Sequence, residues 1–269
     1  MKYLVTGGAG FIGSHMVDFL LQNGHKVVVI DNFSGYYPIS LKRQNQKIIE
    51  ANGAEVLEAD LAQPGNYELL DKDFDFIIHF AAQPGIDPNS SFESYVKNNI
   101  VATKQLVEYA KQLRQLKMFI NIGTSSIYGS NATKSEEQTP MPTSYYGVTK
   151  LAAEQLVLAE ARKGKLNACS LRLYSVFGPR ERPDKLFTKL INCAFNNKKF
   201  PLFDGSETHL RSFTYVNDII KGIYQASRAH KLLNKEIVNL GNHEQHSTKD
   251  GILAVENQLK KHIDLKILP

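Results

Sequence analysis

The stretch TGGAGFIGSH, which begins at Thr6, limits the possible folds more than any other part of the chain. It follows the apolar run KYLVT and precedes a segment of helical composition, 13–22. Its spaced glycines match the pattern G-x-G-x-x-G: Gly8, Gly10 and Gly13. Glycines between a strand and a helix let a pyrophosphate approach the backbone and the helix N-terminus. The context predicts a nucleotide-binding turn, and a tight turn without a ligand is the alternative.

Short apolar runs rich in β-branched residues recur along the chain and predict strands: 2–6, 26–30, 54–59, 74–80, 117–122 and 170–176. The segments between them predict helices: 13–22, 41–52, 92–116 and 146–162. Uninterrupted apolar strands indicate burial on both faces of a sheet. The alternation predicts an α/β fold, a Rossmann-like doubly wound parallel sheet with helices on both sides.

The pattern changes after Gly178, where loops surround a short predicted helix, 186–196. An amphipathic segment, 216–230, and a short strand, 236–240, follow. We therefore expect a nucleotide-binding domain over 1–174, to which 213–241 return. A smaller C-terminal lobe, 175–212 and 242–269, is expected to bind substrate, because ligands of such sheets sit beyond the carboxyl ends of the strands.

Composition narrows the class of protein. The 269 residues are 42% apolar and carry a formal charge of +5, which suits a globular protein with an anionic ligand. We expect neither nucleic-acid binding nor a membrane span, because no dense basic block and no long apolar segment occurs in the sequence. A cytoplasmic location is expected. Cys169 and Cys193 lack metal-like spacing, so buried free thiols and no metal are predicted.

Asp31 follows the second predicted strand, eighteen residues after Gly13. A carboxylate here can accept two hydrogen bonds from an adenosine ribose and would repel a 2′-phosphate. No arginine stands at Asn32 or Phe33, so the pattern favours NAD over NADP. Alternatively, Asp31 caps the loop that follows it.

The segment SYYGVTK places Tyr146 and Lys150 four residues apart at the start of a strong predicted helix. Residues at this spacing share one helix face, so a phenol and an ammonium can meet at one point. The spacing alone occurs by chance in a chain of this composition, and a surface tyrosine is the alternative. Without further residues the pair does not define a reaction.

Eight motifs in order resemble the extended short-chain dehydrogenase/reductase family, which contains NAD-dependent sugar-nucleotide epimerases and dehydratases. The similarity covers nearly the whole chain and is closest to the UDP-glucuronate 4-epimerases, through TSS before IYG and through GPRERPD. The motifs begin at these residues: TGGAGFIG at Thr6, DL at Asp60, HFAAQPG at His79, NN at Asn98, GTSSIYG at Gly123, YGVTK at Tyr146, SLRLYSVFGPRERPD at Ser170 and RSFTYVND at Arg211.

The resemblance implies that Tyr146 is the catalytic base, that Lys150 activates it and that Thr124 shares a hydrogen bond with the reacting sugar oxygen. It implies an NAD site that includes Tyr146, Lys150 and the following residues: Gly7, Gly10, Phe11, Ile12, Gly13, Asp31, Asn32, Asp60, Leu61, Ala81 and Ala82. His79 is assigned no proton transfer, because a lone histidine of this kind is more often structural.

The resemblance also implies a substrate site. Ser125 and Ser126 stand where dehydratases and decarboxylases carry acidic residues, so dehydration is disfavoured. Ser175 and Arg211 are expected to contact the UDP-sugar, although the usual aspartate after the arginine is here serine. Arg182 is expected to hold a uronate carboxylate with two hydrogen bonds.

The implied activity is NAD-dependent C4 epimerisation of a UDP-sugar, most closely UDP-glucuronate to UDP-galacturonate through a 4-keto intermediate. Alternatives are epimerisation of a neutral or N-acetylated UDP-hexose, net oxidoreduction, decarboxylation of UDP-glucuronate, or a non-catalytic NAD-binding sensor or scaffold. A homodimer is expected through the helices that begin near Phe92 and Tyr146. The sequence ends at LKILP, where relatives usually continue, so a shortened substrate lobe is expected.

Overall fold

The computed structural model describes residues 1–85, 90–130, 132 and 135–269. The chain forms two compact units. The first contains Met1–Leu173 and Ile220–Leu240, and the second contains Tyr174–Ile219 and Gly241–Pro269. Each unit has its own apolar core.

A seven-stranded sheet in the order β11-β6-β5-β4-β1-β2-β3 forms the centre of the first unit. Every neighbouring pair of strands is parallel. The strands are β1 Lys2–Thr6, β2 Lys26–Asp31, β3 Glu55–Glu58, β4 Phe76–His79, β5 Met118–Thr124, β6 Ala168–Leu173 and β11 Ile237–Leu240. The order reverses between β1 and β4, as in a doubly wound Rossmann sheet. The predicted fold class is confirmed.

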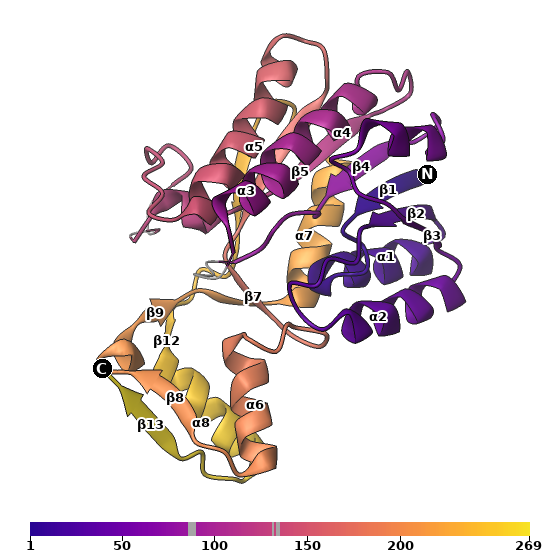
Figure 1. Ribbon diagram of the computed structural model, residues 1–269. Coiled ribbons are helices and arrows are strands. Elements are labelled where there is room, and N and C mark those ends of the chain that lie inside the picture. The colour runs from indigo at the N-terminus through magenta and orange to yellow at the C-terminus, as the bar shows by residue number, and fades with distance from the viewer. Residues whose placement is uncertain (86–89, 131, 133–134) are drawn as a thin grey trace. The chain divides into compact units, whose positions relative to one another are not determined.

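Helices cover both faces of this sheet (Figure 1). One group contains α1 Phe11–Gln22, α2 Ile39–Ala51 and α7 Val216–Arg228. The other contains α3 Phe92–Tyr95, the π-helical segment η2 Val96–Val101, α4 Ala102–Ala110 and α5 Tyr145–Arg162. Rings of Phe19 and Tyr224, 5.2 Å apart, join α1 to α7. Two 3₁₀ turns, η1 Pro64–Leu69 and η3 Ser125–Tyr128, follow strands β3 and β5.

Two predicted elements differ from the structure. The helix predicted over 92–116 ends at Ala110 and contains the π-helical segment, where buried Asn99 bonds to other parts of the unit. The strand predicted over 170–176 ends at Leu173. Residues Ser175–Phe177 form β7, which belongs to a separate sheet.

The second unit contains three two-stranded sheets and two main helices, α6 Leu186–Asn196 and α8 Thr248–Leu259. A short 3₁₀ turn, η4 Ser206–Thr208, lies between β8 and β9. The paired strands are β7 with β10 Phe213–Tyr215, β9 Leu210–Arg211 with β12 His246–Ser247, and β8 Phe200–Phe203 with β13 Leu265–Leu268. Residues 213–219 were expected to return to the first domain, but they group with the second unit, because β10 pairs with β7.

Candidate functional site

The glycine-rich turn lies between β1 and α1. The Gly7 amide donates to the carbonyl of Ile30 at 2.8 Å, and the Gly10 amide donates to the carbonyl of Gly7 at 3.1 Å. Gly10 is the N-cap residue of α1 and has no side chain with which to occupy the first amides of the helix. The helix N-terminus therefore suits an anion such as a pyrophosphate.

The turn requires glycine at two positions for steric reasons. Gly7 has φ +68°, and a Cβ there would lie 2.8 Å from the Ala81 amide nitrogen. A Cβ on Gly13 would lie 2.4 Å from the Gly7 carbonyl oxygen. These close approaches hold the turn against the end of β4 and against the first turn of α1.

Asp31 lies at the carboxyl end of β2 and is buried. Its carboxylate accepts hydrogen bonds from the amides of Phe33, at 2.9 Å, and Ala9, at 3.2 Å. It thus ties its own loop to the glycine turn, which is the capping role considered from the sequence. A carboxylate has further lone pairs, so these bonds leave capacity for ribose hydroxyls.

Sequence reasoning missed Lys42. Its Nζ lies 3.7 Å from Asp31 Oδ1, donates to Ser34 Oγ at 3.1 Å and lies 5.2 Å from the ring centre of Tyr37. Burial lowers the pKa of Lys42, and Asp31 opposes that effect. The signal was present in α2, where Lys42, Asn45 and Ile49 are buried at helical spacing.

The other predicted cofactor residues also lie at the carboxyl edge of the sheet. Asp60, after β3, pairs with Lys97 Nζ at 2.7 Å. Leu61 is buried, whereas Asn32 is exposed. The Ala81 amide, after β4, donates to Thr6 Oγ1 at 3.2 Å, and Ala82 follows it half-buried.

His79 is a buried structural residue. Its Nδ1 lies 2.7 Å from Thr6 Oγ1, and its Nε2 lies 2.9 Å from Thr103 Oγ1. Because the Thr103 hydroxyl donates to the Asn99 carbonyl, its oxygen accepts from His79 Nε2–H, and Nδ1 accepts from Thr6. Burial, with repulsion from Lys150, lowers the pKa of His79 to about 3. The ring is therefore neutral and joins β1, β4 and α4.

Helix α5 begins with the candidate catalytic residues. Ser144 caps the helix by accepting a hydrogen bond from the Gly147 amide at 3.1 Å. Tyr146 is half-buried, and its ring centre lies 6.5 Å from that of Tyr95. Lys150, one turn later, is 4% exposed. Burial lowers its pKa to about 8, and attraction to Glu154 opposes that shift.

The turn that follows β5 packs against the start of α5. A Cβ on Gly147 would lie 2.7 Å from the Ser126 carbonyl oxygen, so the absence of a side chain allows this approach. Thr124 Oγ1 accepts from the Ser126 amide and donates to Ser126 Oγ, both at 3.2 Å. Ser125 and Ser126 are half-buried. The structure therefore brings the Thr124 turn to the helix that carries Tyr146 and Lys150.

Asn99 supports this arrangement from the π-helical segment η2. Its Oδ1 accepts from the Gln83 amide at 2.7 Å, and its Nδ2 donates to Thr149 Oγ1 at 3.0 Å. Thr149 precedes Lys150 and donates to the Tyr145 carbonyl at 2.8 Å. A π-helical insertion of this kind often marks a functional site. The amino-acid composition of this segment did not predict the π-helical insertion.

The predicted substrate residues Ser175, Arg182 and Arg211 lie in the second unit. Arg182 is buried, and its Nη2 donates to Asp184 Oδ2 at 3.1 Å. Desolvation lowers the pKa of Lys185, and repulsion from Arg182 and Arg211 adds to that effect. The three cations thus lie in one part of the second unit, and both arginines are close enough to repel Lys185.

The same cluster contains Glu181. Desolvation raises its pKa to about 7, and attraction to Lys185 opposes the rise. Ser212, which replaces the usual aspartate, donates to the Asn242 carbonyl at 2.5 Å. Ser175 is half-buried in β7.

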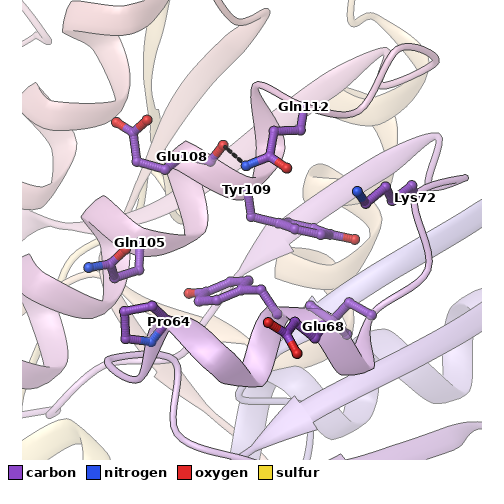
Figure 2. A pocket seen from close by; sticks show the side chains of 9 residues that line it. Pro64, Glu68, Lys72, Gln105, Glu108, Tyr109 and Gln112 are labelled. Carbon is purple, nitrogen blue, oxygen red and sulfur yellow. Dashed lines mark hydrogen bonds between the residues drawn. The ribbon is translucent and has the colours of Figure 1, made fainter.

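A cavity of about 300 Å³ lies between η1 and α4 (Figure 2). It is lined by Pro64, Tyr67, Glu68, Leu70, Lys72, Gln105, Glu108, Tyr109 and Gln112. The rings of Tyr67 and Tyr109 lie 5.4 Å apart in its wall, and burial raises the pKa of both phenols. None of the predicted site residues lines this cavity.

The two cysteines are buried and free, as predicted, and burial raises the pKa of Cys169 to about 12. Within the ranges that the structure describes, we find no cluster of three metal-ligating side chains. Over the same ranges, no helix combines the length and apolar character needed to cross a bilayer.

Comparison with known proteins gives consistent matches over most or all of the chain. The model of the NAD dependent epimerase/dehydratase family matches residues 3–241. An uncharacterized UDP-glucose epimerase, YtcB, of Bacillus subtilis (strain 168) is 37% identical, over 96% of this chain and 82% of that protein. UDP-glucuronate 4-epimerase 4 of Arabidopsis thaliana is 32% identical over 96% of this chain, which spans only 63% of that longer protein.

Among solved structures, a UDP-glucuronic acid 4-epimerase from Bacillus cereus in complex with UDP-glucuronic acid and NAD has a TM-score of 0.93 and 38% identity. The match covers 100% of this chain and 86% of that one. These findings confirm the resemblance inferred from the eight motifs. The chain belongs to the NAD dependent epimerase/dehydratase family.

Proposed function

We propose that this protein is an NAD-dependent UDP-sugar 4-epimerase that interconverts UDP-glucuronate and UDP-galacturonate. The observation that carries the proposal is the approach of the Thr124 turn to the first turn of α5, where Gly147 lets the Ser126 carbonyl come close to the helix that bears Tyr146 and Lys150. The names of the relatives in Arabidopsis thaliana and Bacillus cereus support the substrate.

The residues at the carboxyl edge of the sheet fit NAD. The α1 N-terminus, behind the crowded glycine turn, suits its pyrophosphate, and Asp31 suits its adenosine ribose. NAD bound there would supply the hydride acceptor for oxidation at C4 of the sugar and the hydride donor for the return to the opposite face. Lys42 keeps the Asp31 carboxylate oriented and partly neutralised.

Tyr146 takes the proton of the 4-hydroxyl and returns it when the 4-keto sugar is reduced. A free phenol has a pKa of about 10, so action near pH 7 requires about 4 kcal/mol of preferential phenolate stabilisation. Lys150, buried one helical turn away, supplies positive charge for this purpose. Thr124 Oγ1 shares a hydrogen bond with the reacting oxygen.

The residues beside Thr124 favour epimerisation over elimination. Ser125 and Ser126 provide hydroxyls, and neither is an acid able to protonate a leaving hydroxyl group. Elimination of water therefore lacks its acid in this turn.

The second unit supplies the proposed substrate contacts. Arg211 and Lys185 suit the diphosphate, Ser175 suits a sugar hydroxyl, and Arg182 suits the uronate carboxylate. Oxidation at C4 makes the substrate a β-keto acid, which loses carbon dioxide when its carboxylate bond aligns with the carbonyl π system. Arg182 prevents that alignment by holding the carboxylate at two points.

We further propose a homodimer that forms through α3 and α5. Exposed apolar side chains gather on these elements, and the rings of Phe92 and Tyr145 lie 5.0 Å apart. Val148, on the same helix as Tyr145, is 44% exposed. Apolar side chains exposed on neighbouring helices suit an interface between two copies of the chain.

Nuclear magnetic resonance of the products tests the proposal. Purified protein with NAD and UDP-glucuronate is expected to yield UDP-galacturonate without net NADH. A UDP-pentose product would reassign the protein as a decarboxylase. Conversion of UDP-glucose but not UDP-glucuronate would favour a UDP-glucose epimerase, the activity that the Bacillus subtilis relative is named for. Bound NAD without any turnover would favour a sensor or scaffold.

A further inference from the structure

An ion pair is buried behind the candidate catalytic residues. Arg172 on β6 donates to Glu154 on α5 through two nitrogens, Nε to Oε2 at 3.0 Å and Nη2 to Oε1 at 2.7 Å. Both side chains are at most 2% exposed. Ser170 Oγ donates to the same carboxylate at 2.9 Å. A buried ion pair is seldom more stabilising than apolar residues of the same volume, so stability alone does not account for it.

The pair faces Lys150 on one side. Glu154 is one helical turn after Lys150, on the same face of α5. Other titratable groups around this part of α5 are Tyr146 on the same helix, Tyr95 on α3, His79 on β4 and Arg172 on β6. His79 is neutral, and Arg172 is bound to Glu154. Attraction to the Glu154 carboxylate opposes the loss of the Lys150 proton.

The pair faces the Thr124 turn on its other side. Arg172 Nη1 donates to the Tyr128 hydroxyl at 2.6 Å, and the guanidinium carbon lies 5.0 Å from the centre of the Tyr128 ring. Tyr128 ends the turn that begins after Thr124. Its hydroxyl donates in turn to Asn239 Oδ1 on β11 at 2.8 Å. One guanidinium thus holds both the helix and the turn.

We propose that Glu154 and Arg172 form a positioning pair, in which Glu154 keeps Lys150 charged and Arg172 fixes the Thr124 turn relative to α5. The role of the pair in turnover rests on the proposed epimerase function. The effect of Glu154 on Lys150 does not rest on that function, because it operates in the protein without sugar or NAD. Neither residue contacts the substrate in this proposal.

The charge of Lys150 is measured directly by titrating the ¹³Cε signals of lysine-labelled protein, with Lys150→Met to assign the signal. In Glu154→Gln, the Lys150 titration is expected to move down by about one pH unit or more. Glu154→Asp retains the charge and is expected to recover most of the shift. Glu160→Gln is the matched control, because Glu160 lies on the same helix but pairs with Lys111 and Lys163.

Glu154→Gln leaves Arg172 buried and unpaired, so the double variant Glu154→Gln with Arg172→Met is measured beside it. The double variant removes both charges and is still expected to lower the Lys150 titration relative to wild type. An unchanged Lys150 titration in the folded double variant would overturn the proposed role of Glu154, whatever the sugar assays show.

The second half of the proposal is tested with Tyr128→Phe. This change removes the hydroxyl that accepts from Arg172, and the Lys150 titration is expected to stay unchanged. We expect kcat to fall about tenfold with little change in KM, because the Thr124 turn loses one of its supports. Wild-type kcat in this variant would contradict the role of Arg172 at the turn. Absence of turnover in the wild type would contradict the epimerase proposal and leave the Lys150 result standing.

Discussion

Gly147→Ala changes the contact that joins the Thr124 turn to α5. The added Cβ would lie 2.7 Å from the Ser126 carbonyl oxygen and 3.0 Å from Pro142 Cβ, well inside the 3.4 Å at which ordinary contact begins. The nearest atom is backbone, so it has no flexible end that can swing away. The helix and the turn must separate by several tenths of an ångström.

Two opposing effects set the change in the free energy of unfolding of Gly147→Ala. Overpacking a close contact costs about 1–3 kcal/mol, whereas alanine in place of glycine within a helix gains about 1 kcal/mol. We therefore expect a net loss of about 1 kcal/mol in the free energy of unfolding. Activity is more sensitive, because a displacement approaching 1 Å at a reacting group costs up to about 100-fold. We expect kcat to fall about 10- to 100-fold.

The assay measures kcat for the UDP-sugar that proves to be the substrate, NAD affinity by calorimetry and Tm. NAD affinity is expected to change little, because the glycine turn lies between β1 and α1, whereas a Cβ on Gly147 would meet Ser126 and Pro142. Gly65→Ala is the control, since a Cβ at that position meets nothing within 4 Å. A Gly147→Ala protein that is more stable than wild type and fully active would refute the packing of the turn on α5.

Three further changes have outcomes that the structure predicts. Asp31→Ala removes the charge that repels a 2′-phosphate and takes from Lys42 its carboxylate partner, so the ratio of NAD to NADP affinity should fall at least about tenfold in calorimetry. Glu181→Gln should raise Tm more at pH 8 than at pH 5. The folded-state pKa of about 7 lies above the unfolded value of about 4.3, so ionisation of Glu181 destabilises the fold progressively as pH rises between these two values. An equal effect at both pH values would contradict this. Val148→Asp should shift the mass by light scattering from dimer to monomer, and an unchanged dimer would place the interface elsewhere.

Much of the fold could be predicted from local patterns in the sequence. The apolar runs and the glycine turn at the start of the chain predicted β1, α1 and β2 close to their observed bounds. Helix α6 begins and ends where its apolar periodicity predicts. The end of the strand at Leu173 was not visible in the sequence, because SLRLYSV contains no glycine, proline or other turn signal between Leu173 and Ser175. Its last residues leave the sheet because their pairing partner is β10, about forty residues later in the chain.

The candidate site was predicted less completely. The eight motifs indicated Thr124, Tyr146 and Lys150, and the structure brings the first to the helix that carries the other two. Lys42 and Glu154 were missed because charged residues on a helix usually face solvent, and only tertiary partners reveal why these are buried. Glu154 pairs with Arg172, eighteen residues later on another element. The partners of Lys42 are nearer in sequence, but they lie at the end of β2 and in the loop before α2 and not on the helix itself.

The fate of the hydrogen at C4 tests the central claim most directly. UDP-glucuronate labelled with deuterium at C4 is incubated with the protein and NAD in ordinary water, and the product is examined by nuclear magnetic resonance and mass spectrometry. Reversible oxidation at C4 predicts UDP-galacturonate that keeps its deuterium, with Tyr146→Phe slowed by several orders of magnitude. Product that has exchanged the label for solvent hydrogen, or wild-type turnover in Tyr146→Phe, would contradict the account.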